Sequence, residues 1–148
     1  MKITDALKGV GRLYIETAPL IYYVETHPAY LARMDAIIEM VENRPIRAFS
    51  SVITLAEVLI QPLRMGDKSL EQEYREILVN SGGYRLIPIT VRVAESAADL
   101  RARYNLRIPD ALHVASALRT GCDAFLTNDI GIKRVTELTV LVLDELDV

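Results

Sequence analysis

The sequence predicts an α/β fold in which helices cover both faces of a mostly parallel sheet. Three observations lead to this prediction. Short apolar runs typical of strands alternate with longer segments of helical periodicity. The chain has 148 residues, of which 51% are hydrophobic and 25% charged, the balance of a globular protein with its own core. No repeat, low-complexity tract or flexible linker divides it, so we expect one domain over residues 1–148.

Five strands and at least six helices are expected, in alternation. The strand-type runs are 13–15, 46–49, 84–87, 124–126 and 139–143. The helical patterns begin near Pro19 and continue at 28–41, 51–63, 69–79, 90–104 and 109–119, with a short turn at 130–135. Strands that are joined by long helices pair in parallel, and such sheets are covered on both faces.

The helix boundaries are marked by residues that favour starts and stops. Pro19 suits an early helical position, and apolar residues follow it at helical spacing. Thr90 can cap the start of helix 90–104, whose many small residues allow close packing. Gly82 and Gly83 stop the helix before the third strand, and Gly121 ends helix 109–119.

Bulk properties exclude several classes of function. The formal net charge of -3 counts against a protein that grips many phosphates by charge alone. It does not count against an enzyme that holds one phosphate through metal ions. The single cysteine, Cys122, cannot form an internal disulfide, so we expect a reducing compartment, the cytoplasm. No apolar run has signal-peptide or membrane-spanning length, so no membrane association is expected.

Four carboxylates fall where an α/β sheet binds its ligands, outside the carboxyl ends of the strands. Glu16 directly follows the first expected strand, and Asp129 follows the fourth. Glu57 lies among apolar neighbours on a helix, and Asp110 opens the helix that begins at Pro109. Each acid alone also fits a structural role, as a helix-start residue or as a solvated residue on an amphipathic helix.

If these carboxylates share one pocket, the pocket needs a cation. Their mutual repulsion would otherwise raise some of their pKa values. Oxygen ligands select Mg²⁺ or Mn²⁺, and the absence of a Cys/His cluster argues against zinc. Such an ion can activate water and orient a phosphodiester, so no histidine base is required. His27 and His113 are therefore interpreted as a helix-entry and a helix-face residue.

These residues lie in four short motifs that resemble the PIN-domain family and, in their layout, its single-domain VapC toxins. The motifs occur in family order over nearly the whole chain, and they are YIETAPLIY (14–22), SVITLAEV (51–58), IPDALHVA (108–115) and FLTND (125–129). The resemblance implies a three-layer α/β/α sandwich around a five-stranded parallel sheet. It also implies metal-dependent endonuclease cleavage of RNA at a cluster of acids.

Carried over onto these motifs, the resemblance also implies roles for individual residues. Catalytic roles and the binding of Mg²⁺ (or Mn²⁺) fall to Glu16, Glu57, Asp110 and Asp129. Roles in orienting these acids or contacting substrate fall to Thr17, Ser51, Thr127 and Asn128. The family usually has aspartate where this chain has Glu16, whose carboxylate sits on an arm one methylene longer. This difference bears on the strength of activity more than on its type.

The resemblance implies partners as well as chemistry. Family members of this size commonly pair with a small antitoxin and form homodimers, so we expect both, with RNA as substrate. Apolar surface for partners is expected from Val114, Ala117, Leu118 and the pair Tyr22–Tyr23, although burial in the core also explains these residues. Candidates for contact with the RNA backbone, or for an ordinary solvated face, are Arg101, Arg103, Arg107, Lys133 and Arg134.

Three alternatives use a similar fold. A receiver-like phosphoacceptor domain needs paired acids after the first strand, where this chain has only Glu16, and an aspartate after a middle strand, where it has Ser50 and Pro88. A phosphatase with an Asp-x-Asp nucleophile fails in the same way, because Thr17 and Ala18 follow Glu16. The third alternative, a PIN-fold RNA-binding module with weakened catalysis, stays open.

Overall fold

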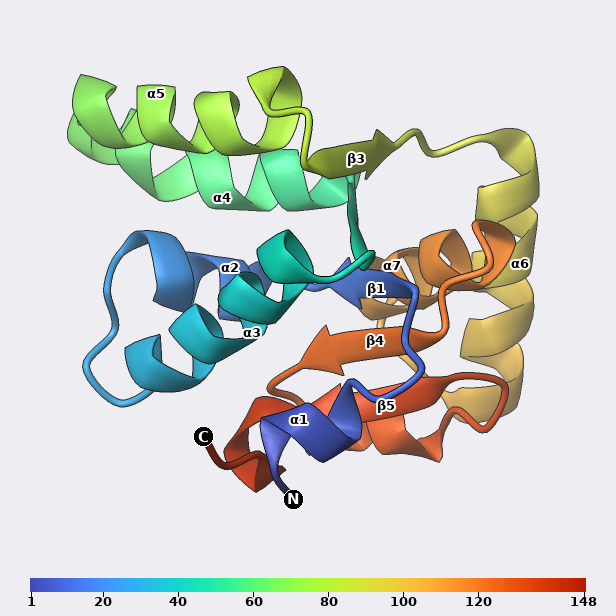
Figure 1. The fold of residues 1–148 in the computed structure, drawn as a ribbon. Helices are drawn as coiled ribbons and strands as arrows, with labels where there is room; N and C mark the ends of the chain where they lie inside the picture. Colours follow the sequence, from blue (N-terminus) through green and yellow to red (C-terminus); the bar gives the residue numbers. More distant parts are fainter.

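A five-stranded parallel sheet lies between two layers of helices in the computed structural model, which describes residues 1–148 (Figure 1). The strand order is β3-β2-β1-β4-β5, and all four pairings are parallel. The strands are β1 (Arg12–Ile15), β2 (Arg47–Ser51), β3 (Tyr84–Ile87), β4 (Ala124–Thr127) and β5 (Thr139–Val142). The predicted α/β/α sandwich is therefore confirmed.

The helices divide between the two faces of the sheet. One face is covered by α1 (Ile3–Ala6), α2 (Thr17–Val24), α3 (Leu31–Asn43), α4 (Val52–Met65) and α5 (Lys68–Arg75). The other is covered by α6 (Val91–Tyr104) and α7 (Ile108–Arg119). Three short turns complete the chain: the π-helical η1 (Glu76–Asn80) and the 3₁₀ turns η2 (Ile130–Arg134) and η3 (Leu143–Glu145). None of the helices is long and apolar enough to cross a membrane.

Three local features differ from the sequence-based expectation. The short helix α1 was not predicted, because four residues are too few to show a period; it is held by a bridge between Lys2 and Asp147 near the two termini (Figure 1). The helix expected at 69–79 changes at Glu76 into a π-helical turn. The helix expected from Pro28 begins at Leu31, after a turn in which Thr26 has a φ of 53°.

Alternating side chains of the strands build a separate core on each face. Leu13 and Ile15 of β1 point to the α1–α5 face, whereas Tyr14 points to the α6–α7 face. This alternation follows from the two-residue period of a strand. Tyr14 stacks on Phe125 of β4 with ring centroids 5.1 Å apart and an interplanar angle of 3°. The Tyr14 hydroxyl is thereby held against α7, which supplies part of the candidate site.

The order of the strands changes direction at β1. β2 follows β1 in sequence and pairs on one side of it, while β4 pairs on the other side. The chain leaving β1 enters α2 on one face, and the chain leaving β4 enters η2, whose Ile132 packs into the opposite core. A parallel sheet opens a crevice at such a point, outside the carboxyl ends of its strands.

Candidate active site

The four predicted acids line one cavity at this crevice. Its volume is about 300 Å³, and Glu16, Glu57, Asp110 and Asp129 are all in its wall. The remaining lining residues are Thr17, Ala18, Ile21, Tyr22, Arg107, Thr127 and Asn128. The loops after β1 and β4 and the helices α4 and α7 each contribute one acid. The fold thus brings together negative charges that are far apart in the sequence.

Glu16 is the most buried of the four acids, with 8% of its surface exposed. It occupies the N-cap position of α2, but its side chain makes no capping hydrogen bond. Its backbone N–H donates to the carbonyl oxygen of Leu126 (3.0 Å), which ties the end of β1 to β4. Burial raises the pKa of the Glu16 carboxyl above its ordinary value, and the nearby charges of Asp110 and Glu57 raise it further, whereas Thr127 and His113 lower it.

This raised pKa predicts a stability effect of Glu16→Gln in the metal-free protein. A carboxyl whose pKa is raised on folding stabilises the folded state below its unfolded pKa, and that contribution is lost as pH rises through the folded pKa. At pH 7.5 we therefore expect Glu16→Gln to be more stable than wild type by about 1 kcal/mol, or roughly 3 °C in Tm. The difference should shrink at pH 4.5, as urea titrations of both proteins would measure.

The matched control for this prediction is Glu95→Gln, which makes the same chemical change at an exposed position on α6. We expect its unfolding free energy to follow that of wild type at both pH values. A Glu16→Gln protein that is less stable than wild type at pH 7.5 would contradict the assignment of Glu16 as a buried, uncompensated charge.

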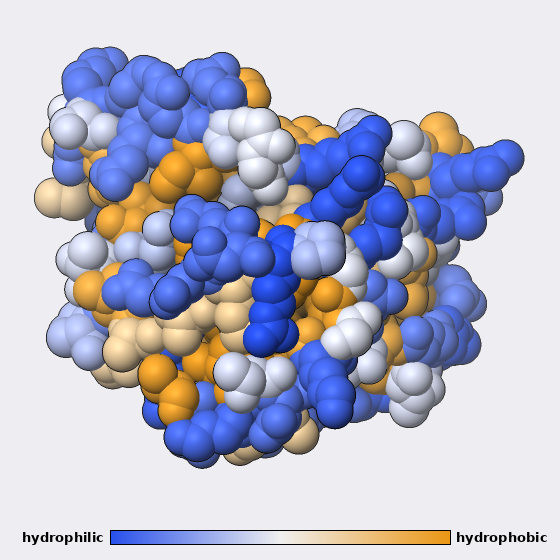
Figure 2. All heavy atoms as spheres, viewed as in Figure 1, coloured by the Kyte–Doolittle hydropathy of each residue, from blue (hydrophilic) through white to orange (hydrophobic).

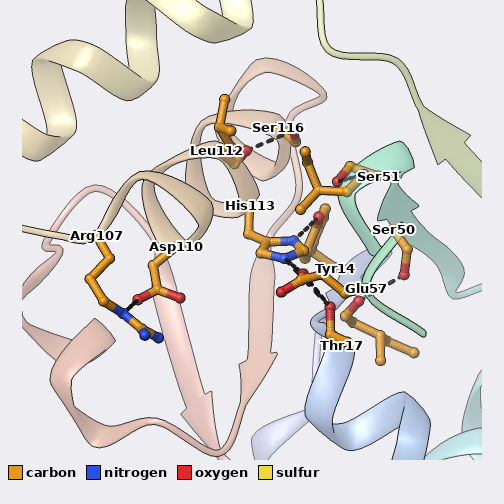
Figure 3. A network of polar contacts seen from close by, with 12 residues as sticks. Tyr14, Thr17, Ser50, Ser51, Glu57, Arg107, Asp110, Leu112, His113 and Ser116 are labelled. Atoms are coloured by element: carbon orange, nitrogen blue, oxygen red, sulfur yellow. Dashed lines mark hydrogen bonds and ion pairs between the residues drawn. The ribbon is translucent and has the colours of Figure 1, made fainter. Parts of the chain in front are cut away.

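Glu57 is held by two hydrogen bonds that the close-up of the site shows (Figure 3). The Thr17 hydroxyl donates to Glu57 Oε1 (2.8 Å), and His113 Nε2 lies 2.6 Å from the same oxygen. Burial alone would raise the pKa of the Glu57 carboxyl, but these hydrogen bonds outweigh it and lower the pKa. The second oxygen, Oε2, takes part in neither bond, so Glu57 keeps an oxygen for a ligand while its orientation is fixed.

The position of Glu57 depends on a buried histidine that the sequence pattern indicates only as a helix-face residue. His113 is 1% exposed, and its Nδ1 lies 2.7 Å from the Tyr14 hydroxyl. Because an ionised Glu57 only accepts, Nε2 carries the hydrogen of that bond, and Nδ1 is left to pair with the Tyr14 hydroxyl. The sequence held one indication of this role: His113 follows Asp110 by three residues, so both lie on one side of α7.

The other two acids are placed differently. Asp110 lies in the first turn of α7 and pairs with Arg107, whose Nε is 3.2 Å from Oδ2. No side chain caps α7, so the alternative role of Asp110 as a helix cap is not realised. Asp129 does act as a cap: its Oδ1 accepts from the N–H of Gly131 (2.8 Å) at the start of η2. Its other oxygen makes no recorded hydrogen bond.

Two further lining residues order the turn that carries Asp129. Thr127 is fully buried, and its hydroxyl accepts from the N–H of Asp129 (3.0 Å). The Oδ1 of Asn128 accepts from the N–H of Asp144 (2.9 Å). Both residues lie at the cavity, with Thr17, as the sequence analysis expected of the orienting residues. Ser51 is the exception, because it does not line the cavity and instead caps α4 by accepting from the N–H of Ile53 (3.2 Å).

Comparison with known proteins is consistent with this architecture. The family model described as "PIN domain" matches residues 13–138. The chain belongs to the PIN-domain family. The matched span includes all four motifs and every residue of the cavity wall. Comparison with curated proteins gives no significant match. Family membership therefore rests on the family-model match and agrees with the fold.

Several solved structures similar to this PIN domain come from toxin–antitoxin systems. VapBC2 of Rickettsia felis, bound to a promoter DNA fragment, has a chain that matches with a TM-score of 0.70 and 18% identity over 88% of this chain and 98% of that one. A toxin–antitoxin complex from Klebsiella pneumoniae matches with a TM-score of 0.68 and 22% identity, over 88% of this chain and 97% of that one. The Mycobacterium tuberculosis toxin VapC20, described as cleaving the sarcin-ricin loop, matches with a TM-score of 0.67 and 15% identity, over 86% of this chain and 98% of that one. At these identities the likeness establishes the fold.

The oxygen ligands around the PIN-domain cavity fit Mg²⁺ or Mn²⁺ in their chemistry. Four carboxylates line it together with hydroxyl and amide oxygens, and no Cys or His is in the wall. In their present rotamers, however, no three acidic, His or Cys side chains form a group that could hold a metal ion. Glu57, Asp110 and Asp129 each use one carboxylate oxygen in the hydrogen bonds given above, which leaves the other oxygen of each for a cation.

For most of the residues expected to offer apolar surface to a partner, the alternative of burial in the core is the one realised. Val114 and Ala117 are fully buried in the core of the α6–α7 face, and Leu118 and the tyrosines 22 and 23 are half-buried and pack against a core. Apolar exposure lies instead on α4, at Ile60, Leu63 and Met65. In Figure 2 hydrophobic residues are visible on the side of the molecule below the α4–α5 hairpin.

The basic residues proposed for RNA contact are mostly engaged within the protein. Arg103 pairs with Asp99 and Glu137, and Lys133 pairs with Glu145. Arg101 and Arg134 donate to backbone carbonyl oxygens. Only Arg107 lines the cavity.

Proposed function

We propose that this PIN domain is a metal-dependent endoribonuclease, and that it is the toxin of a type II toxin–antitoxin pair. The observation that supports the proposal most directly is the convergence of four carboxylates on one cavity at the carboxyl edge of the sheet. Membership of the PIN family and the likeness to VapC20, a toxin that cleaves the sarcin-ricin loop, agree with it.

In this proposal Glu16, Glu57, Asp110 and Asp129 hold Mg²⁺ or Mn²⁺ and are the catalytic acids. A divalent cation bound there supplies water activation and neutralises charge on the phosphodiester during hydrolysis. Thr17 and His113 fix the rotamer of Glu57, and Thr127 and Asn128 fix the turn that presents Asp129. Fixed ligands lose less conformational freedom when the cation and the substrate bind.

The burial of Glu16 fits the same proposal. Its raised pKa reports a carboxylate that is poorly solvated and lies near two other acids. A buried group of this kind stores an unfavourable interaction that a cation would relieve. We therefore propose that Glu16 couples cation binding to the stability of the fold, so that the protein is more stable with the cation than without it.

Removal of the metal tests the proposal. Purified protein is incubated with labelled RNA in Mn²⁺ or Mg²⁺, with excess chelator, and with chelator followed by added Mn²⁺. We expect cleavage with the metal, a fall of at least about 100-fold with chelator, and recovery when Mn²⁺ is returned. Calcium at the same concentration is the control for ionic strength. Cleavage that continues in chelator would rule out a metal-dependent reaction at these acids.

The second candidate function is a PIN-fold RNA-binding module with weakened catalysis. It rests on Glu16, whose carboxylate reaches further into the cavity than the aspartate that the family usually has there. If this extra length displaces the cation, Glu16→Asp should raise cleavage above that of wild type. RNA binding without cleavage by either protein, in Mg²⁺ and in Mn²⁺, would favour the binding module.

We also propose a small antitoxin partner and a homodimer. The structural neighbours from Rickettsia felis and Klebsiella pneumoniae are from VapBC or toxin–antitoxin complexes, which supports the antitoxin. The exposed apolar residues of α4 are available surface for a partner. Light scattering of the purified chain tests the dimer. Co-expression with the neighbouring short reading frame tests the antitoxin, because a true partner should co-purify and suppress cleavage.

A further inference from the structure

Two adjoining cavities on the α6–α7 face of the sheet are lined by arginines. One, of about 380 Å³, has Arg12, Arg85 and Arg119 in its wall. The other, of about 330 Å³, is lined by Arg92 and Arg119. The cavities share Ile87, Pro88, Arg119 and Thr120. We call these two cavities, with the neighbouring Arg47, the arginine groove.

Register explains how the strands supply three of these arginines to one face. Arg12 of β1 pairs with Arg47 of β2, and Phe49 pairs with Arg85 of β3. Residues paired in a parallel sheet share a face, and Phe49 belongs to the core on the α6–α7 side. Figure 2 shows strongly hydrophilic residues over the region of β3, consistent with this placement.

The charges of the groove are not neutralised within the protein. None of the five arginines forms an ion pair with a carboxylate. The nearby Asp123 accepts from the backbone N–H groups of Gly11 and Arg12, not from a guanidinium. Arg12 and Arg47 lie opposite each other on strands about 4.8 Å apart, an arrangement that repels. Concentrating five cations on one face of a protein with net charge -3 favours an anionic ligand.

Part of the groove is rigid. The Arg12 guanidinium lies 4.8 Å from the centroid of the Phe49 ring, and its Nε donates to the carbonyl oxygen of Thr120 (3.0 Å). Arg12 and Arg119 therefore also have a structural role, because their positive charges lie at the C-terminus of α7, the negative end of the helix dipole. These contacts do not account for Arg47, Arg85 and Arg92, whose side chains are exposed and make no hydrogen bond within the protein. Guanidinium groups presented in this way suit phosphates, which they can bind through two hydrogen bonds.

From this arrangement we infer that the arginine groove binds phosphates of the RNA backbone, away from the acidic cavity. The inference rests on the proposed ribonuclease function, which supplies the RNA. Two open cavities with a shared wall suit a chain of repeated phosphates better than one small anion. Arg12 and Glu16 stand at opposite ends of β1, about 13 Å apart, and Asp110 and Arg119 are about 13 Å apart along α7. A dinucleotide has a single phosphodiester and cannot occupy both sites at once, whereas a longer RNA can.

RNA length therefore separates the two sites. Binding of a 20-nucleotide RNA and of a dinucleotide is measured by fluorescence anisotropy in chelator, for wild type and for Arg85→Ala/Arg119→Ala. The control is Arg44→Ala/Arg64→Ala, which removes two exposed arginines that also have no acidic partner but lie outside the groove. We expect the groove variant to bind the 20-mer about tenfold more weakly and its salt slope to fall by about 1.4, which is 0.7 per lost phosphate contact.

Cleavage in Mn²⁺ gives an independent readout. For the 20-mer the groove variant should show a KM about tenfold higher with kcat unchanged, and for the dinucleotide neither should change. If wild type binds the 20-mer through the groove but cleaves nothing, the ribonuclease proposal fails and the groove inference stands. If wild type cleaves and the groove variant matches the control, the groove inference alone is overturned. Displacement of the 20-mer by a mononucleotide at micromolar concentration would also overturn it, because the groove would then bind one small anion. So would a groove variant that binds RNA as wild type does but no longer co-purifies with an acidic protein, because the groove would then be a protein-binding surface.

Discussion

Asp110→Asn is expected to lower the rate of metal-dependent RNA cleavage by about 100-fold or more. Asparagine keeps the shape of the side chain but removes the negative charge that a divalent cation requires. The fold should survive, because the ion pair that is lost involves Arg107, whose side chain is 80% exposed, and such pairs contribute about 0–1 kcal/mol. Initial rates at saturating Mn²⁺, with Mn²⁺ affinity from calorimetry, measure the effect.

The matched control for Asp110→Asn is Asp99→Asn. Asp99 also pairs with an arginine on a helix surface, since its Oδ2 lies 2.8 Å from Arg103, but it does not line the acidic cavity. We expect its cleavage rate to stay within about twofold of wild type, as for most surface substitutions. If Asp110→Asn cleaved RNA as fast as Asp99→Asn, the chemistry would lie outside this cavity, in a contaminant or elsewhere on the chain.

His113→Ala is expected to lower kcat by about 10- to 100-fold and to raise the Mn²⁺ concentration that gives the half-maximal rate. The histidine does not line the cavity; we interpret it as a positioning residue that acts through Glu57 Oε1, 2.6 Å away. Without it, Glu57 is held by Thr17 alone and can turn away from the cavity (Figure 3). The substitution also leaves the buried Tyr14 hydroxyl without its partner, at a cost of about 1–3 kcal/mol.

Two readouts distinguish positioning from general loss of stability. At a temperature where His113→Ala is fully folded, raising Mn²⁺ should recover part of the rate, which a merely structural defect would not allow. Thr17→Val removes the other hydrogen bond to Glu57 without touching Tyr14, and it should shift the Mn²⁺ dependence in the same direction by about threefold to tenfold. An unchanged Mn²⁺ dependence in both variants would show that Glu57 needs neither contact.

Local patterns in the sequence were sufficient to predict most of the elements. The strand runs that begin at Leu13, Tyr84 and Thr139 lie within a residue of the observed strands, because fully buried parallel strands are short, apolar and bounded by helices. The short α1 and the π-helical turn at Glu76 escaped prediction. α1 has only four residues and is held by the bridge from Lys2 to Asp147, and the π-helical turn spans only five residues, so neither leaves a periodic signal.

The sequence by itself determined which acids follow the strands and begin the helices, because chain order in a parallel sheet fixes the edge at which strand ends emerge. It could not determine what each side chain touches. Only the tertiary structure decided that His113 supports Glu57, and that five arginines without acidic partners lie together on a face away from the acids. The position of His113 depends on the packing of α7 against Tyr14, and the gathering of the arginines depends on strand register, and both couple residues that no local pattern links.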